Sequence, residues 1–190
     1  MWNLIRTAVL LLTVITGLTG FVYPLAVTGL AQIFFPHQAN GSLIRIDEHR
    51  RVSELIGQPF SDPKYFWGRP SATMPLAYNA ASSAGSNLGP TNRALEEAAG
   101  DRVATLRKSD PRNRLPVPVD LVTTSGSGLD PHISPAAALY QVPRVARARG
   151  LDDRIVAALV RRSVCDRQFG LFGEPTVHVL RLNMALDALR

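Results

Sequence analysis

The hydrophobic pattern begins with one long apolar segment at the start of the chain. Between Arg6 and Arg45 there is no Asp, Glu, Lys or Arg, and residues 7–35 are almost wholly apolar or small. A helix of about 20 apolar residues crosses a hydrocarbon core of about 30 Å, because it pairs its backbone polar groups internally. The pattern predicts a transmembrane anchor over residues 1–36, followed by one soluble domain over residues 37–190. Pro24 removes one helical hydrogen bond, which predicts a kink in the anchor.

A cleaved secretory signal is the alternative interpretation of this segment. Signal peptides have an apolar region of about 7–15 residues. The segment here is about twice that length and contains Tyr23 and Pro24, so its length favours a retained anchor.

The charges beside the anchor do not assign its orientation. Arg6 lies before it, whereas Arg45, Arg50 and Arg51 lie beyond its other end, within the range in which positive charge affects topology. Large domains translocate largely regardless of charge. We therefore expect a short N-terminus inside the cell and a periplasmic or extracellular soluble domain.

After the anchor, several helices and short strands are predicted between long loops. Apolar spacing and capping residues predict helices over 92–108, 134–150, 154–167 and 182–189, and strands over 43–46 and 177–180. The segment from Val52 to Tyr65 is predicted to be mostly turns, because it contains glycine and prolines. The predicted fold class is mixed α/β, with a small sheet, several helices and long ordered loops rich in Gly, Ser and Pro.

Single residues predict further details of the later helices. Ser134 is the expected N-cap of the second helix, which Pro143 is expected to interrupt before its end at Gly150. Asp152 or Asp153 is the expected N-cap of the third. Cys165 falls on the apolar stripe of that helix and is expected to be a small buried hydrophobe.

Composition excludes several kinds of site. The net charge is +6, but the arginines are scattered and form no dense basic run with interleaved aromatics, so no nucleic-acid partner is expected. A single cysteine excludes an internal disulfide. The four histidines occur singly, with no H-x-x-x-H or C-x-x-C spacing, so no metal site is expected.

The densest polar stretch is TTSGSGLDPHISP, over residues 123–135. Ser125, Ser127, Asp130 and His132 supply the residue types of a hydrolase triad. Ser127 is not in a G-x-S-x-G elbow, however, since Ser125 and Leu129 occupy the outer positions. Neither this stretch nor GSNLGPTN at 85–92 contains a phosphate-binding G-x-x-x-x-G-K-[ST] loop.

A structural role therefore fits this stretch better than catalysis, with partner docking as the second interpretation. Asp130 and Pro131 would set a turn, His132 would hydrogen-bond locally and Ser134 would cap a helix. Arg69, next to Phe66 and Trp67, is expected to stack on an aromatic ring or bind a carboxylate, in a partner or within its own domain.

Four sequence runs, together with the anchor, carry a family resemblance. They are IGQPFSDPKYFWGRPSAT, YNAASSAGSNLGPTN, PVPVDLVTTSGSGLDPHISPAAALYQVPRVARARG and GEPTVHVLRLNMALD. In this order they resemble the KdpC family, the C subunit of the bacterial Kdp potassium-transporting P-type ATPase. The chain departs from the family pattern at Thr176, where Arg is usual, and at His178, where Asn is usual.

The resemblance implies a non-catalytic accessory subunit of a high-affinity potassium uptake complex in the bacterial inner membrane. Its partners would be a channel-like potassium-binding subunit, a P-type ATPase subunit and a small stabilising peptide. ATP hydrolysis would belong to a partner, since this chain lacks a D-K-T-G phosphorylation motif. No cofactor of its own is expected, because ATP and potassium are handled by the complex. Two roles compete for the family: raising the ATP affinity of the ATPase subunit, or covering the potassium entrance from outside.

No catalytic residue is expected under this interpretation. The residues expected to form a partner-docking or functional loop are Arg69, Ser71, Asn87, Ser125, Ser127, Asp130, His132 and Ser134. Two alternatives stay open. One is a membrane-anchored periplasmic hydrolase that uses Ser127 and His132, and the other is a free periplasmic binding protein released by cleavage near Gln32.

Overall fold

The protein forms two compact units, each described here by itself. The computed structural model describes residues 1–46 and 51–189. The chain divides into Met1–Ser53 and Glu54–Arg190. The predicted mixed α/β fold class, with one apolar N-terminal helix and small sheets, is confirmed.

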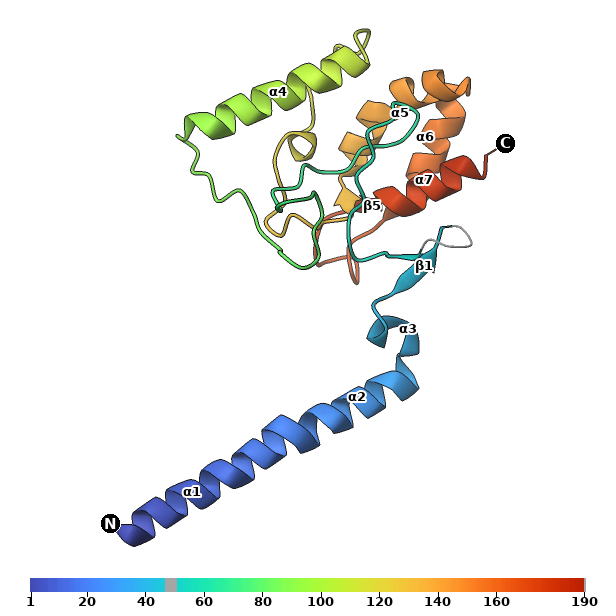
Figure 1. Ribbon diagram of the computed structural model, residues 1–190. Coiled ribbons are helices and arrows are strands. Elements are labelled where there is room, and N and C mark those ends of the chain that lie inside the picture. The colour runs from blue at the N-terminus through green and yellow to red at the C-terminus, as the bar shows by residue number, and fades with distance from the viewer. Residues whose placement is uncertain (47–50, 190) are drawn as a thin grey trace. The chain divides into compact units, whose positions relative to one another are not determined.

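The first unit is dominated by the apolar helix. Helix α1 (Trp2–Gly17), a π-helical turn (Leu18–Val22) and α2 (Tyr23–Phe34) follow one another as a single rod, drawn in blue in Figure 1. This stretch of 33 residues is long and apolar enough to cross a membrane. The π-helical turn directly precedes Tyr23 and Pro24, the first two residues of α2. The kink expected at Pro24 stays a prediction.

A short helix and a hairpin complete this unit. Helix α3 spans Pro36–Ala39, and strands β1 (Leu43–Arg45) and β2 (Arg51–Ser53) pair antiparallel. The first strand confirms the prediction for 43–46, one residue shorter. The second lies in part where turns were predicted, because its cross-strand pairing is not visible in local sequence.

The second unit contains a small sheet and most of the helices. Its elements are α4 (Arg93–Ser109), the 3-10 turn η2 (Val119–Leu121), β3 (His132–Ile133), α5 (Pro135–Arg149), α6 (Asp153–Arg162), β4 (Val164–Cys165), β5 (Thr176–His178) and α7 (Val179–Asp187). Strand β5 is central, with β3 and β4 antiparallel on its two sides. Helices α5, α6 and α7 lie together beside this sheet (Figure 1).

The core of this unit forms where the helices meet the sheet. Val177 of β5, Ile133 of β3, Val145 of α5 and Leu182 of α7 are almost fully buried. Phe66, which comes from a long loop, is buried among them. The core therefore depends on a loop residue as well as on regular elements.

The predicted helix starts at Asn92, Ser134 and Asp152 are confirmed. Each of these side chains accepts a hydrogen bond from a backbone N–H in the first turn of its helix. Gly150 ends α5 in the left-handed conformation, with φ +67.

Three predictions about these helices are wrong. Helix α5 continues through Pro143, because burial of neighbours such as Val142 and Val145 outweighs one lost hydrogen bond. Helix α6 ends at Arg162, and Cys165 is exposed in β4, where it pairs with Thr176. Helix α7 begins three residues before the predicted position, since His178 caps it.

Candidate functional site

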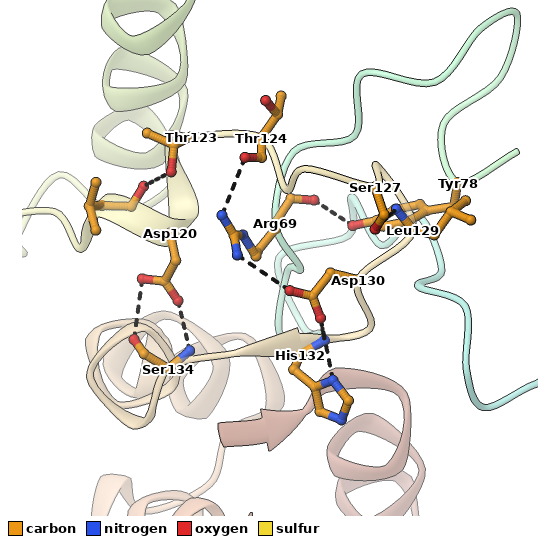
Figure 2. Close-up of polar contacts among 11 residues, drawn as sticks. Arg69, Tyr78, Asp120, Thr123, Thr124, Ser127, Leu129, Asp130, His132 and Ser134 are labelled. Carbon is orange, nitrogen blue, oxygen red and sulfur yellow. Dashed lines mark hydrogen bonds and ion pairs between the residues drawn. The ribbon is translucent and has the colours of Figure 1, made fainter. Parts of the chain in front are cut away.

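An ion pair joins two of the predicted loop residues that lie far apart in the sequence. Arg69 Nη1 donates to Asp130 Oδ2 at 3.3 Å, and Arg69 Nη2 donates to the carbonyl oxygen of Thr124 at 3.3 Å (Figure 2). Arg69 therefore binds a carboxylate of its own domain, and it is Arg144, not Arg69, that stacks on Trp67, with 4.2 Å between guanidinium and ring centre. This contact holds the loop around residue 69 against the loop around residue 130.

The second carboxylate oxygen of Asp130 fixes the turn into β3. Asp130 Oδ1 accepts the backbone N–H of His132 at 2.9 Å and lies 3.3 Å from His132 Nδ1. Burial alone would raise the pKa of Asp130, but the hydrogen bonds from His132 and the charges of His132 and Arg69 outweigh it and hold this pKa below its ordinary value. Asp130 is thus kept as a carboxylate that orders its own turn.

Ser134 closes the other end of the turn by holding the start of α5. Its Oγ accepts the N–H of Ala137 at 3.0 Å, and its own N–H donates to Asp120 Oδ2 at 2.7 Å. The Ser134 hydroxyl also donates to Asp120 Oδ1 at 3.2 Å (Figure 2). The capping role predicted for Ser134 is confirmed, and Asp120 is a partner that the sequence analysis missed.

Ser71 links the same loop to a third segment. Its hydroxyl donates to the carbonyl oxygen of Gly128 at 2.7 Å and accepts the N–H of Tyr78 at 2.9 Å. The Tyr78 hydroxyl in turn donates to the carbonyl oxygen of Arg69 at 2.5 Å. Burial, reinforced by the nearby charge of Asp130, raises the pKa of Tyr78 to about 12, so this hydroxyl stays protonated and able to donate.

Close backbone approach at glycines shows how tightly these segments interlock. A Cβ on Gly57 would lie 2.2 Å from the Tyr78 ring, and one on Gly85 would lie 2.8 Å from the carbonyl oxygen of Gly126. The N–H of Gly57 donates to the Leu129 carbonyl oxygen at 2.8 Å. The segments 57–85 and 123–132 therefore form one interlocked body, called here the loop cluster.

The remaining predicted residues differ in their position. Ser125 is buried in the loop cluster, and its carbonyl oxygen accepts the N–H of Gly128 at 3.3 Å. The exposed Ser127 accepts the N–H of Leu129 at 3.1 Å with its Oγ. Asn87 is exposed, and among the described residues no hydrogen bond joins its side chain to the cluster. The structure thus brings together all of the predicted set except Asn87.

The hydroxyl of Ser127 and the ring of His132 have separate partners. Ser127 Oγ is bonded to a backbone N–H, whereas His132 Nδ1 faces Asp130. Within residues 1–46 and 51–189 no hydrogen bond joins Ser127 to His132. In this structure His132 is therefore not placed to activate Ser127 as a nucleophile.

A cavity of about 380 Å³ borders the loop cluster. Its lining includes Phe60, Trp67 and Tyr78, together with Arg69 and Arg102. Burial lowers the pKa of Arg102, and its Nη1 donates to the carbonyl oxygen of Val122 at 2.7 Å. In the described part of the chain no three His, Cys, Asp or Glu residues are grouped to hold a metal ion.

Three polar residues that the sequence analysis missed hold the loop at 63–67. Asn183 of α7 accepts the N–H of Phe66 at 2.9 Å and donates to its carbonyl oxygen at 3.0 Å. Gln141 of α5 makes the same two contacts with Trp67, at 2.8 and 3.1 Å. Arg144 donates to the carbonyl oxygens of Pro63 and Tyr65, and burial lowers its pKa to about 10. The only sequence signal was a polar residue on an otherwise apolar helix face.

His178 packs edge-on against His132, with 5.0 Å between ring centres. Its Nε2 donates to the carbonyl oxygen of Glu54 at 2.7 Å, and its Nδ1 accepts the N–H of Arg181 at 3.4 Å. Burial, followed by the charges of His132 and Arg181, lowers the pKa of His178, although contacts with Glu54 oppose this shift. The folded protein therefore favours the neutral form of the His178 ring.

We expect this histidine to make the folded protein less stable in mild acid. Below the ordinary pKa of about 6.5 the unfolded chain binds a proton at His178 that the folded chain does not bind. The contribution of His178 to the free energy of unfolding is therefore complete above that pH. It is lost as the pH falls toward the lower pKa that His178 has in the folded protein. The measurement is the urea unfolding midpoint of the full chain in detergent between pH 5 and 8.

His178→Asn is the matched variant for this test. Asparagine keeps a capping oxygen but does not titrate, and His132 is retained in both proteins. We expect the pH slope to be smaller in the variant. Identical slopes in the two proteins would contradict the assignment.

Comparisons with known proteins agree on one family. The protein-family model described as K+-transporting ATPase, c chain (KdpC) matches residues 5–188 of this chain. The potassium-transporting ATPase KdpC subunit of Methylococcus capsulatus is 63% identical over 190 residues, all of both chains. Those of Sorangium cellulosum and Dechloromonas aromatica are 62% and 58% identical, over 98% of both chains and over 100% and 99% respectively.

Proposed function

Since this chain belongs to the KdpC family of K+-transporting ATPase c chains, we propose that it acts as a non-catalytic accessory subunit that stabilises assembly of the ATP-driven potassium uptake complex. Its partners in this proposal are the channel-like potassium-binding subunit, the P-type ATPase subunit and the small stabilising peptide. ATP hydrolysis takes place in a partner. The chain needs no cofactor of its own.

The observation that carries this proposal is the internal use of the polar groups in the loop cluster and at Ser134, which follows it directly. Arg69, Ser71, Asp130 and Ser134 each bond within their own domain. These contacts order the loops before any partner is bound, so binding costs little further conformational entropy. A preformed surface of this kind suits an assembly subunit better than a site of chemical turnover.

The apolar helix supplies the second contact in this proposal. No residue of its most apolar window is buried, and a Cβ on Gly17, Gly20 or Gly29 would have nothing within 4 Å. Small residues let two membrane helices approach closely. Assembly therefore begins with packing of Trp2–Phe34 against helices of the partner subunits.

The domain after the anchor lies outside the cytoplasm in this proposal, over the potassium entrance. ATP is cytoplasmic, so an effect on its affinity would act indirectly. The domain would contact two states of the complex unequally and so couple to the ATP site without touching the nucleotide. No residue of this chain is assigned to ATP.

Purification of the complex tests the proposal. A chain with a C-terminal tag, extracted in mild detergent, is expected to bring the other subunits with it. A control chain, in which residues 2–34 are replaced by an unrelated apolar span of equal length, should stay in the membrane but recover fewer partners. Recovery of no ATPase subunit by the parent chain would overturn the proposal.

The alternative hydrolase has its own test. If the purified chain hydrolyses a substrate and Ser127→Ala abolishes this activity, the chain is a hydrolase instead.

Cys165 makes the placement of the domain testable as well. It is the single cysteine of the chain and is exposed. A membrane-impermeant thiol reagent should label it in cells with a permeabilised outer membrane and an intact inner membrane. Labelling only after the inner membrane is broken would place the domain in the cytoplasm.

A further inference from the structure

Three large apolar side chains lie exposed at the tip of the loop between β4 and β5. Phe169 is 89% exposed, Leu171 69% and Phe172 61%. They fall within four consecutive residues, and none belongs to the hydrophobic core. We call this group the Phe169 tip. A soluble surface rarely gathers such side chains without a contact to make.

The Phe169 tip is held in a defined shape by its own backbone. Gln168 and Phe172 exchange two N–H to carbonyl hydrogen bonds, both at 2.9 Å. Leu171 N–H also donates to the Gln168 carbonyl oxygen at 3.1 Å, and an ion pair of 2.6 Å joins Arg167 to Glu174 below the tip. The segment is therefore an ordered hairpin that presents its apolar side chains.

Phe169 is an unfavourable choice for the backbone position it occupies. Its φ is +55 and that of Gly170 is +72, so two consecutive residues are left-handed. Turns of this kind favour Asn, Asp or Gly at the first position, because a bulky side chain is strained there. Since Phe169 is also exposed, its aromatic ring does nothing for the fold that would offset this strain.

We propose that the Phe169 tip inserts into an apolar cleft on another protein subunit of the potassium-transporting ATPase complex. This inference rests on the proposed function, which supplies the partner. The expected cleft accepts two phenylalanine rings and one leucine side chain. Apolar anchors of this kind at the centre of an interface commonly provide a large share of the binding energy.

Charge and shape favour a protein partner over a lipid surface. Loops that bind anionic bilayers combine apolar residues with Lys or Arg. Here Arg167 is already paired with Glu174, and Asp166 makes no ion pair among the described residues, so the hairpin is net acidic. A fixed, strained shape is useful for filling a cleft and unnecessary for entering lipid. A basic rim on the partner would complement Asp166.

A second copy of this chain is also a poor occupant. A tip that enters a cleft elsewhere on an identical chain makes a head-to-tail contact. Such contacts form rings or open filaments, whereas two-fold pairing needs the same patch on both copies. We therefore assign the apolar cleft to a different subunit of the complex.

Phe169→Asn separates folding from docking. Asparagine suits the left-handed position, so the unfolding midpoint of the full chain should be equal to or above that of the parent. Removal of the ring should weaken recovery of the partner subunits by the tagged chain about tenfold or more. Leu115→Asn is the control, since Leu115 is also exposed, at 61%, but lies in another loop.

The outcomes of this experiment distinguish failure of the proposed function from failure of this inference. A parent chain that recovers no subunit defeats the proposed function itself. A parent and a Phe169→Asn variant that recover them equally defeat only this inference. Photocrosslinking from benzoylphenylalanine at position 171 in the assembled, membrane-embedded complex should join this chain to a protein subunit, and a crosslink to lipid alone would overturn the assignment.

Discussion

Replacement of Gly128 with alanine is expected to destabilise the soluble unit by about 3 kcal/mol or more, because two separate costs add at this position. Gly128 has a φ of +68, where a side chain is strained. An added Cβ would also lie 2.6 Å from the Ala84 carbonyl oxygen and 2.6 Å from Thr73 Cγ2. The backbone would have to move, and the hydrogen bond from Ser71 to the Gly128 carbonyl oxygen would be lost or lengthened.

Gly126→Ala is the matched control for this prediction. A Cβ on Gly126 has nothing within 4 Å, and this residue is exposed, two positions away in the same loop. We expect its effect to stay within about 0.5 kcal/mol. Urea unfolding of the full chain in detergent, followed by the change in tryptophan fluorescence as Trp67 becomes exposed, measures both variants against the same contribution from Trp2. Equal midpoints for the two would show that the loop cluster is not held at Gly128.

Replacement of Asn183 with alanine is expected to cost about 4 kcal/mol. The amide of Asn183 pairs with both backbone groups of Phe66, and Phe66 is fully buried. Alanine leaves a buried N–H and a buried carbonyl oxygen without partners, at about 1–3 kcal/mol each. Release of Phe66 would also loosen the core that it fills.

Asp187→Ala tests whether burial is the cause. Asp187 lies on the same helix and also holds this loop, since it accepts from the Tyr65 hydroxyl at 3.2 Å and from Arg149 Nη2 at 2.6 Å. Its side chain is half exposed, so water replaces the lost contacts, and the expected cost is below about 1 kcal/mol. Both variants can be followed in one series of denaturant titrations. Similar losses for Asn183→Ala and Asp187→Ala would refute the buried pairing.

Predictions that depend on a few neighbouring residues were the accurate ones. The long apolar N-terminal helix, the caps at Ser134 and at Asp152, and the end of α5 at Gly150 all depend on contacts within one or two turns. A capping side chain bonds to a backbone group two or three residues away, so its partner is visible in the sequence.

Predictions that required knowledge of distant partners failed. The apolar stripe of Ile155, Leu159 and Cys165 predicts a helix through Cys165, but pairing with β5 places Cys165 in a strand. Pro143 predicts an interruption of α5. The helix stays intact because it is buried against other elements, which the local sequence does not show. Asn183 and Gln141 were missed because their partners lie 117 and 74 residues away.

The sequence by itself determined that the chain has one membrane-competent helix, that its later helices begin at specific caps, and which family its motifs resemble. Those properties follow from local spacing and from the side chains themselves. Only the tertiary structure decided that Arg69 faces Asp130, that Ser127 and His132 have separate partners, and that Phe169 lies exposed in a strained turn. The reason is physical: a side chain's partners and its exposure are set by which distant segments the fold brings beside it.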